Sequence, residues 1–173
     1  MNRISWFPVL RLNVVCALDA EIVRDAARFL NDGEKMQLSY AVQNTHRTVG
    51  TRTSSHIVRN FGMRNSLHLD HLTVKLTGSA GQALGAFAAP GLKIEVSGDA
   101  NDYVGKGLSG GIISVRPPMV SPLVAAENTI IGNTVLYGAT DGYLFAAGRA
   151  GERFAVRNSG AKVVVEGCGS NGC

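Results

Sequence analysis

The residues best placed to do chemistry form a glycine-rich run, GKGLSGG, from Gly105 to Gly111. It contains the spacing Gly-x-Gly-x-x-Gly, which in dinucleotide-binding proteins lets the backbone approach a pyrophosphate. That chemistry also needs a helix directly after the glycines, because the helix N-terminus faces the phosphate. Here the apolar residues 112–115 predict a strand instead, and Arg116-Pro-Pro ends it. We therefore interpret the run as a tight corner between strands, with nucleotide binding as the weaker alternative.

Two polar clusters are further candidates for binding. Residues 68–71 read His-Leu-Asp-His, but on a strand or at the entry to a loop these side chains would not face one point, so we favour surface residues over a metal site. Asp99, Asn101 and Asp102 lie in a loop, where such side chains usually bond backbone groups of the turn. Binding of a cation or of a partner loop is the alternative for this second cluster.

Three arginines recur at every fourth position, at Arg149, Arg153 and Arg157. On a strand the second and third would share the outward face, so we interpret the three as a solvated or interface-facing row that could contact a neighbouring domain, with an anion site as the alternative. The serines in glycine turns have no histidine placed to act as their base. We therefore predict no catalytic, cofactor-binding or metal-ligating residue in this chain.

Composition favours a folded chain with many turns. Glycine accounts for 21 of 173 residues, 45% of residues are hydrophobic and only 17% are charged. The net charge of +4 is scattered and has no aromatic platform beside it, which argues against nucleic-acid binding. Neither a membrane span nor a signal peptide is predicted. The odd cysteine count (Cys16, Cys168 and Cys173) favours a reducing compartment, so we expect a cytoplasmic protein, or a plastid one in a photosynthetic eukaryote.

The chain divides into three expected parts: an irregular segment at 1–17, a helix–strand–helix preface at 18–70 and a β domain at 71–173. In the preface, Asp19 is the expected N-cap of a first helix. Alternating residues at 36–42 predict a strand. A second helix is expected from about Thr53 to Phe61.

From residue 71 onward, short apolar strands and glycine turns recur. A twenty-residue frame aligns strands at 91–96, 111–115, 131–136 and 151–156, with second strands at 143–146 and 162–165. This period predicts a mostly β, solenoidal stack, in which glycine corners let successive coils approach closely. The predicted corners are Gly98, Gly105, Gly107, Gly110, Gly111, Gly138, Gly142, Gly148, Gly151 and Gly160.

Long blocks of the chain also resemble a known family. The blocks at 78–82, 98–111, 131–140 and 148–160 closely resemble the C-terminal domain of the glutamate synthase large subunit, and the likeness covers about residues 18–173. His46 departs from it, since the family usually has Asp at this position. The resemblance implies a right-handed parallel β-helix, a single-stranded solenoid preceded by a short α/β segment.

The resemblance also implies a function. In the parent enzyme such a domain carries no catalytic group and braces the amidotransferase domain against the domain that holds FMN and an iron–sulfur cluster. The enzyme forms glutamate from glutamine and 2-oxoglutarate. We therefore expect a scaffold whose partners are other glutamate synthase domains and which has no cofactor of its own. The alternative is a free-standing β-helix interaction subunit of another oxidoreductase complex, similar to that of formylmethanofuran dehydrogenase.

The resemblance implies further coils after Cys173, so we expect a fragment whose last coil is open. The strand at Lys162–Val165 would then expose unpaired backbone groups, and we expect self-association through it.

Overall fold

The computed structural model describes residues 17–172. The predicted irregular segment, apart from Ala17, therefore lies outside the described residues, as do Cys16 and Cys173. The elements, in order, are α1 (Ala17–Asp25), α2 (Ala27–Asp32), β1 (Met36–Val42), α3 (Thr51–Phe61), β2 (Leu72–Ala80), β3 (Leu92–Ala100), β4 (Ser109–Arg116), the 3-10 turn η1 (Ala125–Glu127), β5 (Thr129–Ile131), β6 (Asp141–Ala150) and β7 (Lys162–Cys168).

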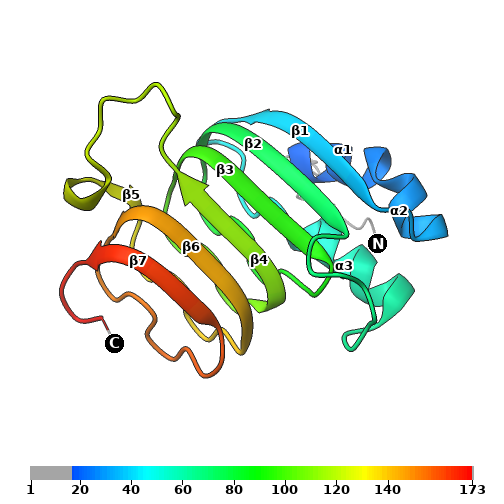
Figure 1. Ribbon diagram of the computed structural model, residues 1–173. Coiled ribbons are helices and arrows are strands. Elements are labelled where there is room, and N and C mark those ends of the chain that lie inside the picture. Colours follow the sequence, from blue (N-terminus) through cyan, green and yellow to red (C-terminus); the bar gives the residue numbers. More distant parts are fainter. Residues whose placement is uncertain (1–16, 173) are drawn as a thin grey trace, which may run out of the picture.

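One parallel sheet dominates the structure, and few helices accompany it (Figure 1). Its order is β1-β2-β3-β4-β6-β5, and β7 also pairs with β6. Alternating burial along β3 and β6 places one set of side chains inside and the other outside. The mostly β prediction is confirmed. Because β1 pairs with β2 from Met36 and Leu72 to Val42 and Gly78, the sheet crosses the boundary expected at residue 70.

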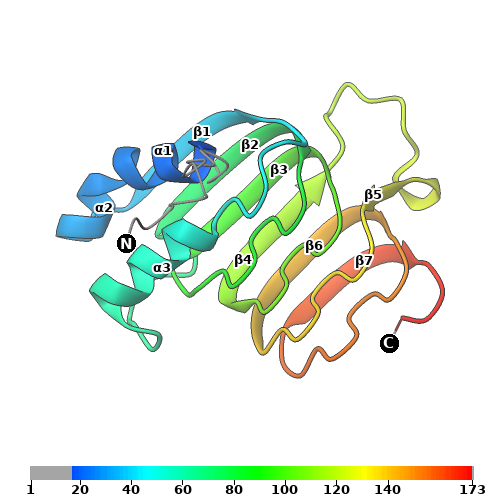
Figure 2. The same ribbon diagram turned by 180° about the vertical axis from the view of Figure 1, so that it is seen from behind.

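The helices lie at the β1 end of the sheet (Figures 1 and 2). The expected first helix is present, and its side chains Ile22, Ala26 and Phe29 are buried. The helix is interrupted at Ala26 and so forms α1 and α2. At its end, the Gly33 N–H donates to Phe29 O at 2.9 Å from a left-handed conformation. The Phe29 ring stacks on Phe61 of α3, with 5.4 Å between the ring centroids.

Asp19 does not have the role expected from the sequence. It lies inside α1, and its buried carboxylate accepts hydrogen bonds from the N-terminus of α3. The Arg52 N–H donates at 2.7 Å, and Thr53 donates through both its N–H and its hydroxyl. The first turn of a helix has N–H groups without intrahelical partners. A side chain distant in sequence thus caps α3, which begins at Thr51, before the expected start.

We expect Asp19→Ala to destabilise the fold by about 2 kcal/mol, because it leaves buried donors of α3 without an acceptor. Asp19→Asn keeps one acceptor oxygen and should cost about 1 kcal/mol or less. Chemical denaturation of the two variants beside the unsubstituted chain measures the difference. Equal losses in both variants would contradict the capping role.

An ion pair joins the segments that precede β1 and β2. Lys35 Nζ donates to Asp70 Oδ2 at 2.7 Å, and this hydrogen bond lowers the pKa of Asp70 below its ordinary value. A depressed carboxyl pKa stabilises the folded state above the unfolded-state pKa, and this contribution is lost as the pH falls through the folded-state value.

We therefore expect Asp70→Asn to reduce the melting temperature slightly at neutral pH and to leave it unchanged at a pH below the folded-state pKa of Asp70. Lys35→Gln should reproduce the neutral-pH effect, and the double variant should add little to either single change. Thermal unfolding across the acidic range tests this. A loss of stability that persists at the lowest pH would assign the effect to something other than the ion pair.

The strands do not keep the twenty-residue frame along the whole chain. Leu72 pairs with Leu92, twenty residues on, and Lys93 pairs with Ile112, nineteen residues on. Ile112 then pairs with Tyr143, thirty-one residues on, before the spacing returns to nineteen at Lys162.

The cause is an insertion inside one rung of the stack, where a rung is one strand level together with the segment that connects it to the next. Ser97 pairs with Arg116 and Ala100 with Ile131, so three positions on β3 correspond to fifteen on the next rung. The twelve additional residues separate β4 from β5. The strands expected at 131–136 and 151–156 are consequently wrong: β5 ends at Ile131, and residues 151–156 form turns, whereas those expected at 143–146 and 162–165 are confirmed in β6 and β7.

Between strands, the chain returns behind the sheet in segments that run beside one another (Figure 2). We call residues 81–91, 101–108, 132–140 and 151–161 the connecting segments. In each of them, every second residue of a five-residue stretch has a φ between 55° and 66°. These residues are Ala83, Gly85, Phe87, Tyr103, Gly105, Gly107, Thr134, Leu136, Gly138, Arg153, Ala155 and Arg157.

The alternation produces a second hydrogen-bond ladder. N–H groups of left-handed residues donate to carbonyls of adjacent segments: Gly105 to Leu84 O at 2.9 Å, Leu136 to Val104 O at 2.8 Å and Ala155 to Val135 O at 2.9 Å. A non-glycine residue in this conformation costs about 1 kcal/mol. Bonding to adjacent segments offsets that cost, since an unpaired buried N–H is expensive. Between sheet and ladder lie fully buried side chains from both, including Ile94, Leu108, Ile113 and Leu136.

Candidate functional site

The glycine run that suggested phosphate binding belongs to the stack of connecting segments. Gly105 and Gly107 have φ values of 64° and 63°, and their N–H groups donate to Leu84 O and Tyr137 O, each at 2.9 Å. Neither N–H is therefore free to bind an anion. No helix follows the glycines: β4 begins at Ser109, which confirms the strand expected at 112–115 and places Gly110 and Gly111 inside it.

The ten predicted corner glycines occupy two kinds of position. Gly105, Gly107, Gly138, Gly151 and Gly160 lie in connecting segments, whereas Gly98, Gly110, Gly111, Gly142 and Gly148 lie inside strands. Several are close to the next rung. A Cβ at Gly107 would stand 2.5 Å from the Phe87 ring, and one at Gly110 would stand 2.5 Å from Pro90 Cγ. Their shared role in close stacking remains a prediction.

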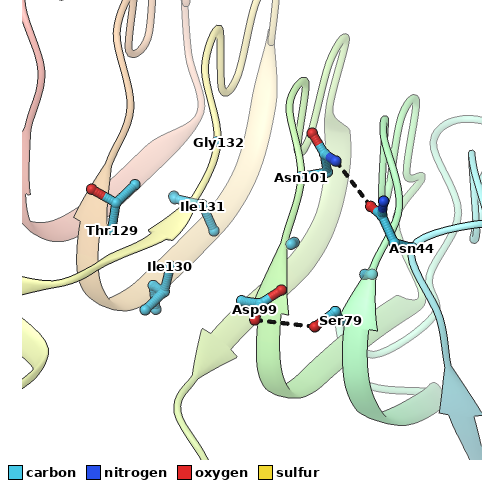
Figure 3. Close-up of a pocket in the computed structure, with 10 residues that line it drawn as sticks. Asn44, Ser79, Asp99, Asn101, Thr129, Ile130, Ile131 and Gly132 are labelled. Atoms are coloured by element: carbon cyan, nitrogen blue, oxygen red, sulfur yellow. Dashed lines mark hydrogen bonds between the residues drawn. The ribbon is translucent and has the colours of Figure 1, made fainter. Parts of the chain in front are cut away.

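A row of polar side chains crosses the rungs where strands pass into connecting segments (Figure 3). Asn101 Nδ2 donates to Asn44 Oδ1 at 2.9 Å, and its Oδ1 accepts from the Asp102 N–H at 2.7 Å. Asp102 Oδ1 accepts from the Asn133 N–H, and Asn133 Oδ1 from the Glu152 N–H. The expected bonding to turn backbone is thus confirmed for Asn101 and Asp102.

Asp99 differs, because it lies in β3 and not in the expected loop, and its Oδ2 accepts from the Ser79 hydroxyl at 3.1 Å (Figure 3). Asp99 and Ser79 line a depression of about 390 Å³ together with Thr129 and Ile130 of β5. Most polar groups along this row are thus already paired within the chain. His46, which stands where the resembled family usually has Asp, also bonds to the backbone of its turn: its Nδ1 accepts from the Gln43 N–H at 3.2 Å.

The histidine pair contributes to packing in the structure. His71 Nε2 lies 2.7 Å from Gly33 O, its ring lies beside that of Phe29, and the His68 ring stacks on it at 6.2 Å. Asp70 is engaged by Lys35. Within residues 17–172, no group of three or more His, Cys, Asp or Glu side chains could hold a metal ion.

The three predicted contact arginines are exposed, but they do not share a strand. Arg149 is in β6, whereas Arg153 and Arg157 lie in the connecting segment and have φ values of 55° and 59°. The expectation that the last two share the outward face of a strand is therefore wrong. The Arg157 guanidinium lies over the Tyr137 ring, 5.8 Å from its centroid. Whether the three contact a neighbouring domain remains a prediction.

The insertion is a feature that sequence reasoning missed. Residues 117–128 leave the sheet after β4 and project from it before β5 (Figure 1). Met119 and Val120 are 86% and 93% exposed, and Leu123 and Val124 are also exposed. The run from 117 to 126 has neither a charge nor a glycine, although both occur throughout the surrounding sequence. That change in composition was the available signal.

None of the helices in the described part of the chain has the length and apolarity that crossing a bilayer requires. The fold is that of a glycine-rich β domain. It combines a parallel sheet with glycine-bearing connecting segments, and polar side chains form hydrogen bonds from one rung to the next. The model of the GXGXG motif family matches residues 19–173. The chain belongs to this family.

The curated relatives are glutamate synthases. The chain is 66% identical over 163 residues to the glutamate synthase [NADPH] large chain of Azospirillum brasilense, covering 94% of this chain and 11% of the relative. It is 49% identical over 156 residues to the glutamate synthase [NADH] of Schizosaccharomyces pombe, covering 90% of this chain and 7% of the relative. It is 52% identical over 134 residues to the ferredoxin-dependent glutamate synthase of Pyropia yezoensis, covering 78% and 9%. The chain is thus a glutamate synthase-related domain that spans about a tenth or less of these relatives' length.

Proposed function

We propose that this chain is a non-catalytic scaffold of glutamate synthase, which forms glutamate from glutamine and 2-oxoglutarate. In this role it braces the amidotransferase domain against the domain that carries FMN and the iron–sulfur cluster. The observation that carries the proposal is the 66% identity to a glutamate synthase large chain across 94% of this chain. Both cofactors belong to parts of the enzyme outside this chain, and we expect a cytoplasmic location for the assembly.

The way polar groups are used supports a scaffold role. Asn101, Asp102 and Asn133 each hold a backbone N–H of a turn. The N–H groups of Gly105 and Gly107 are bonded to adjacent segments. A catalytic site needs polar groups that converge on a substrate, whereas these groups converge on neighbouring rungs. A stack tied at each rung is stiff, which suits a spacer between domains.

We further propose that the domain is a right-handed parallel β-helix. Connecting segments behind the sheet join β2 to β3, β3 to β4, β5 to β6 and β6 to β7. Crossover connections between parallel strands of one sheet are almost always right-handed, because strands twist in one sense. Hydrogen bonds run between rungs on the sheet side and on the connecting side. In this architecture, glycines at close approaches let successive coils lie at strand spacing.

A chimera tests the proposed function. The matching segment of the Azospirillum brasilense large chain is deleted, or is replaced by this chain. We expect the deletion to abolish glutamine-dependent glutamate formation and the replacement to restore it. Glutaminase activity and FMN-dependent electron transfer are also measured separately, because loss of a brace should impair their coupling more than either half-reaction. A folded replacement that restores no coupled activity would refute the proposal.

A further inference from the structure

We propose that the insertion at 117–128 is a docking loop that seats its apolar tip in an apolar groove on another domain of the same glutamate synthase polypeptide. This inference rests on the proposed function. The loop would be the surface through which the scaffold contacts a neighbouring domain, and the surface that receives it would be apolar.

The loop contributes little to its own fold. It interrupts one rung between β4 and β5, and both of these strands pair with β3 on one side and with β6 on the other. On β3 the corresponding rung passes from Ser97 to Ala100 without interruption, so the stack does not need these residues. Ordering a longer connection has an entropic cost. Long loops that a fold does not need are commonly functional, so we expect this loop to have a role in binding.

The chemistry of the loop indicates an apolar receiving surface. Met119 and Val120 at its tip are 86% and 93% exposed, and exposed Leu123 and Val124 follow. No charged residue occurs between Arg116 and Glu127. An isolated exposed apolar residue needs no explanation, whereas several contiguous ones mark an interaction site. Pro117, Pro118 and Pro122 restrict the backbone, which reduces the entropy lost on docking.

The base of the loop is held in place. At the β5 end of the loop, Asn128 Nδ2 donates to Val124 O at 2.8 Å. Pro117, Pro118 and Leu123 line a depression of about 280 Å³ together with Ile130, Gly78 and Gly98. The exposed tip is therefore presented from an anchored base.

The size of the loop favours a neighbouring domain of one polypeptide over a second copy of this chain. Stable interfaces between free proteins bury roughly 800 Å² on each partner, which a single short loop does not provide. Domains within one polypeptide face each other at a high effective concentration, so a small contact suffices. In the curated relatives, the matched segment is only 7% to 11% of the polypeptide, and the rest supplies such neighbours.

Photo-crosslinking locates the occupant. A photoreactive phenylalanine replaces Val120 in the full-length chimera, and the same residue replaces Val164, an exposed apolar position on β7, as the matched control. We expect position 120 to crosslink within the same polypeptide to apolar residues of another domain, mapped by mass spectrometry. Crosslinks to a second copy, or none beyond the domain itself, would overturn the inference.

Limited proteolysis measures the same contact. A protease that cleaves beside large apolar residues should cut next to Leu123 at least tenfold more slowly in the chimera than in the isolated chain. The double variant Met119→Ser/Val120→Ser should lose this protection, while Val164→Ser keeps it. Melting temperatures show whether each variant folds. Equal protection in both variants would refute docking of the loop.

The two proposals fail in different ways. A chimera that is folded but inactive removes the scaffold function, whatever the loop does. An active chimera whose loop neither crosslinks to another domain nor gains protection leaves the scaffold function standing and removes the docking loop.

Discussion

Gly98→Ala is expected to destabilise the domain by about 3 kcal/mol, a fall in melting temperature of about 6 to 12 °C for a chain of this size. Gly98 lies in β3, opposite Gly78 in β2, with a φ of 150°. A Cβ at this position would overlap the carbonyl oxygen of Gly78. The obstacle is backbone, which cannot rotate away as a side chain can, so the two rungs must separate locally.

Gly138→Ala is the matched control. Gly138 also has a positive φ, 66°, but a Cβ there would meet nothing within 4 Å. Alanine should therefore cost only the conformational strain, about 1 kcal/mol. Urea unfolding of the two variants separates strain from collision. If both variants lose the same stability, rung spacing is not what requires glycine at position 98.

Ile113→Ala is expected to cost about 3 to 4 kcal/mol, because it removes a large side chain from the middle of the core. Ile113 is fully buried in β4, between Ile94 of β3 and Leu144 of β6. Its Cδ1 reaches the connecting segments, lying close to the Cβ positions that Gly85 and Gly105 lack. The side chain thus fills the space between sheet and ladder, and rigid rungs on both sides leave the cavity little means to collapse.

The neighbouring isoleucine provides the control. Ile112 faces the other side of the sheet, where it is half-buried between Lys93 and Tyr143. Ile112→Ala should cost about 1 kcal/mol, because part of its surface is already in water. Calorimetry of both variants tests the assignment of faces. A reversed order of the two losses would contradict the register of β4.

Local patterns predicted much of this fold correctly. The alternation at 36–42 and from residue 72 onward corresponds to β1 and β2, and the apolar run after Gly111 lies in β4. The first helix expected after Asp19 corresponds to α1 and α2, where Ile22, Ala26 and Leu30 are buried. Such features depend on a few neighbouring residues whose side chains alternate or recur on one face. They are therefore readable without knowledge of the rest of the molecule.

Features that depend on distant residues were not readable in this way. Asp19 caps α3 rather than its own helix, because thirty-three residues separate it from Arg52 and only packing brings them together. The fixed twenty-residue frame failed after Arg116, because the twelve additional residues displaced every later strand. Arg153 and Arg157 were consequently assigned to a strand, although they lie in a connecting segment.

The sequence by itself determined the family, the parallel β character of the chain and the glycine content that close stacking requires. Only the tertiary structure decided how glycines and other residues share the left-handed positions. Leu136 and Ala155 adopt φ values of 58° and 57°, which no local preference predicts. Their N–H groups bond to carbonyls of adjacent segments, and both side chains are buried. Contacts between rungs thus outweigh a local cost of about 1 kcal/mol per residue, and those contacts exist only after the chain has stacked.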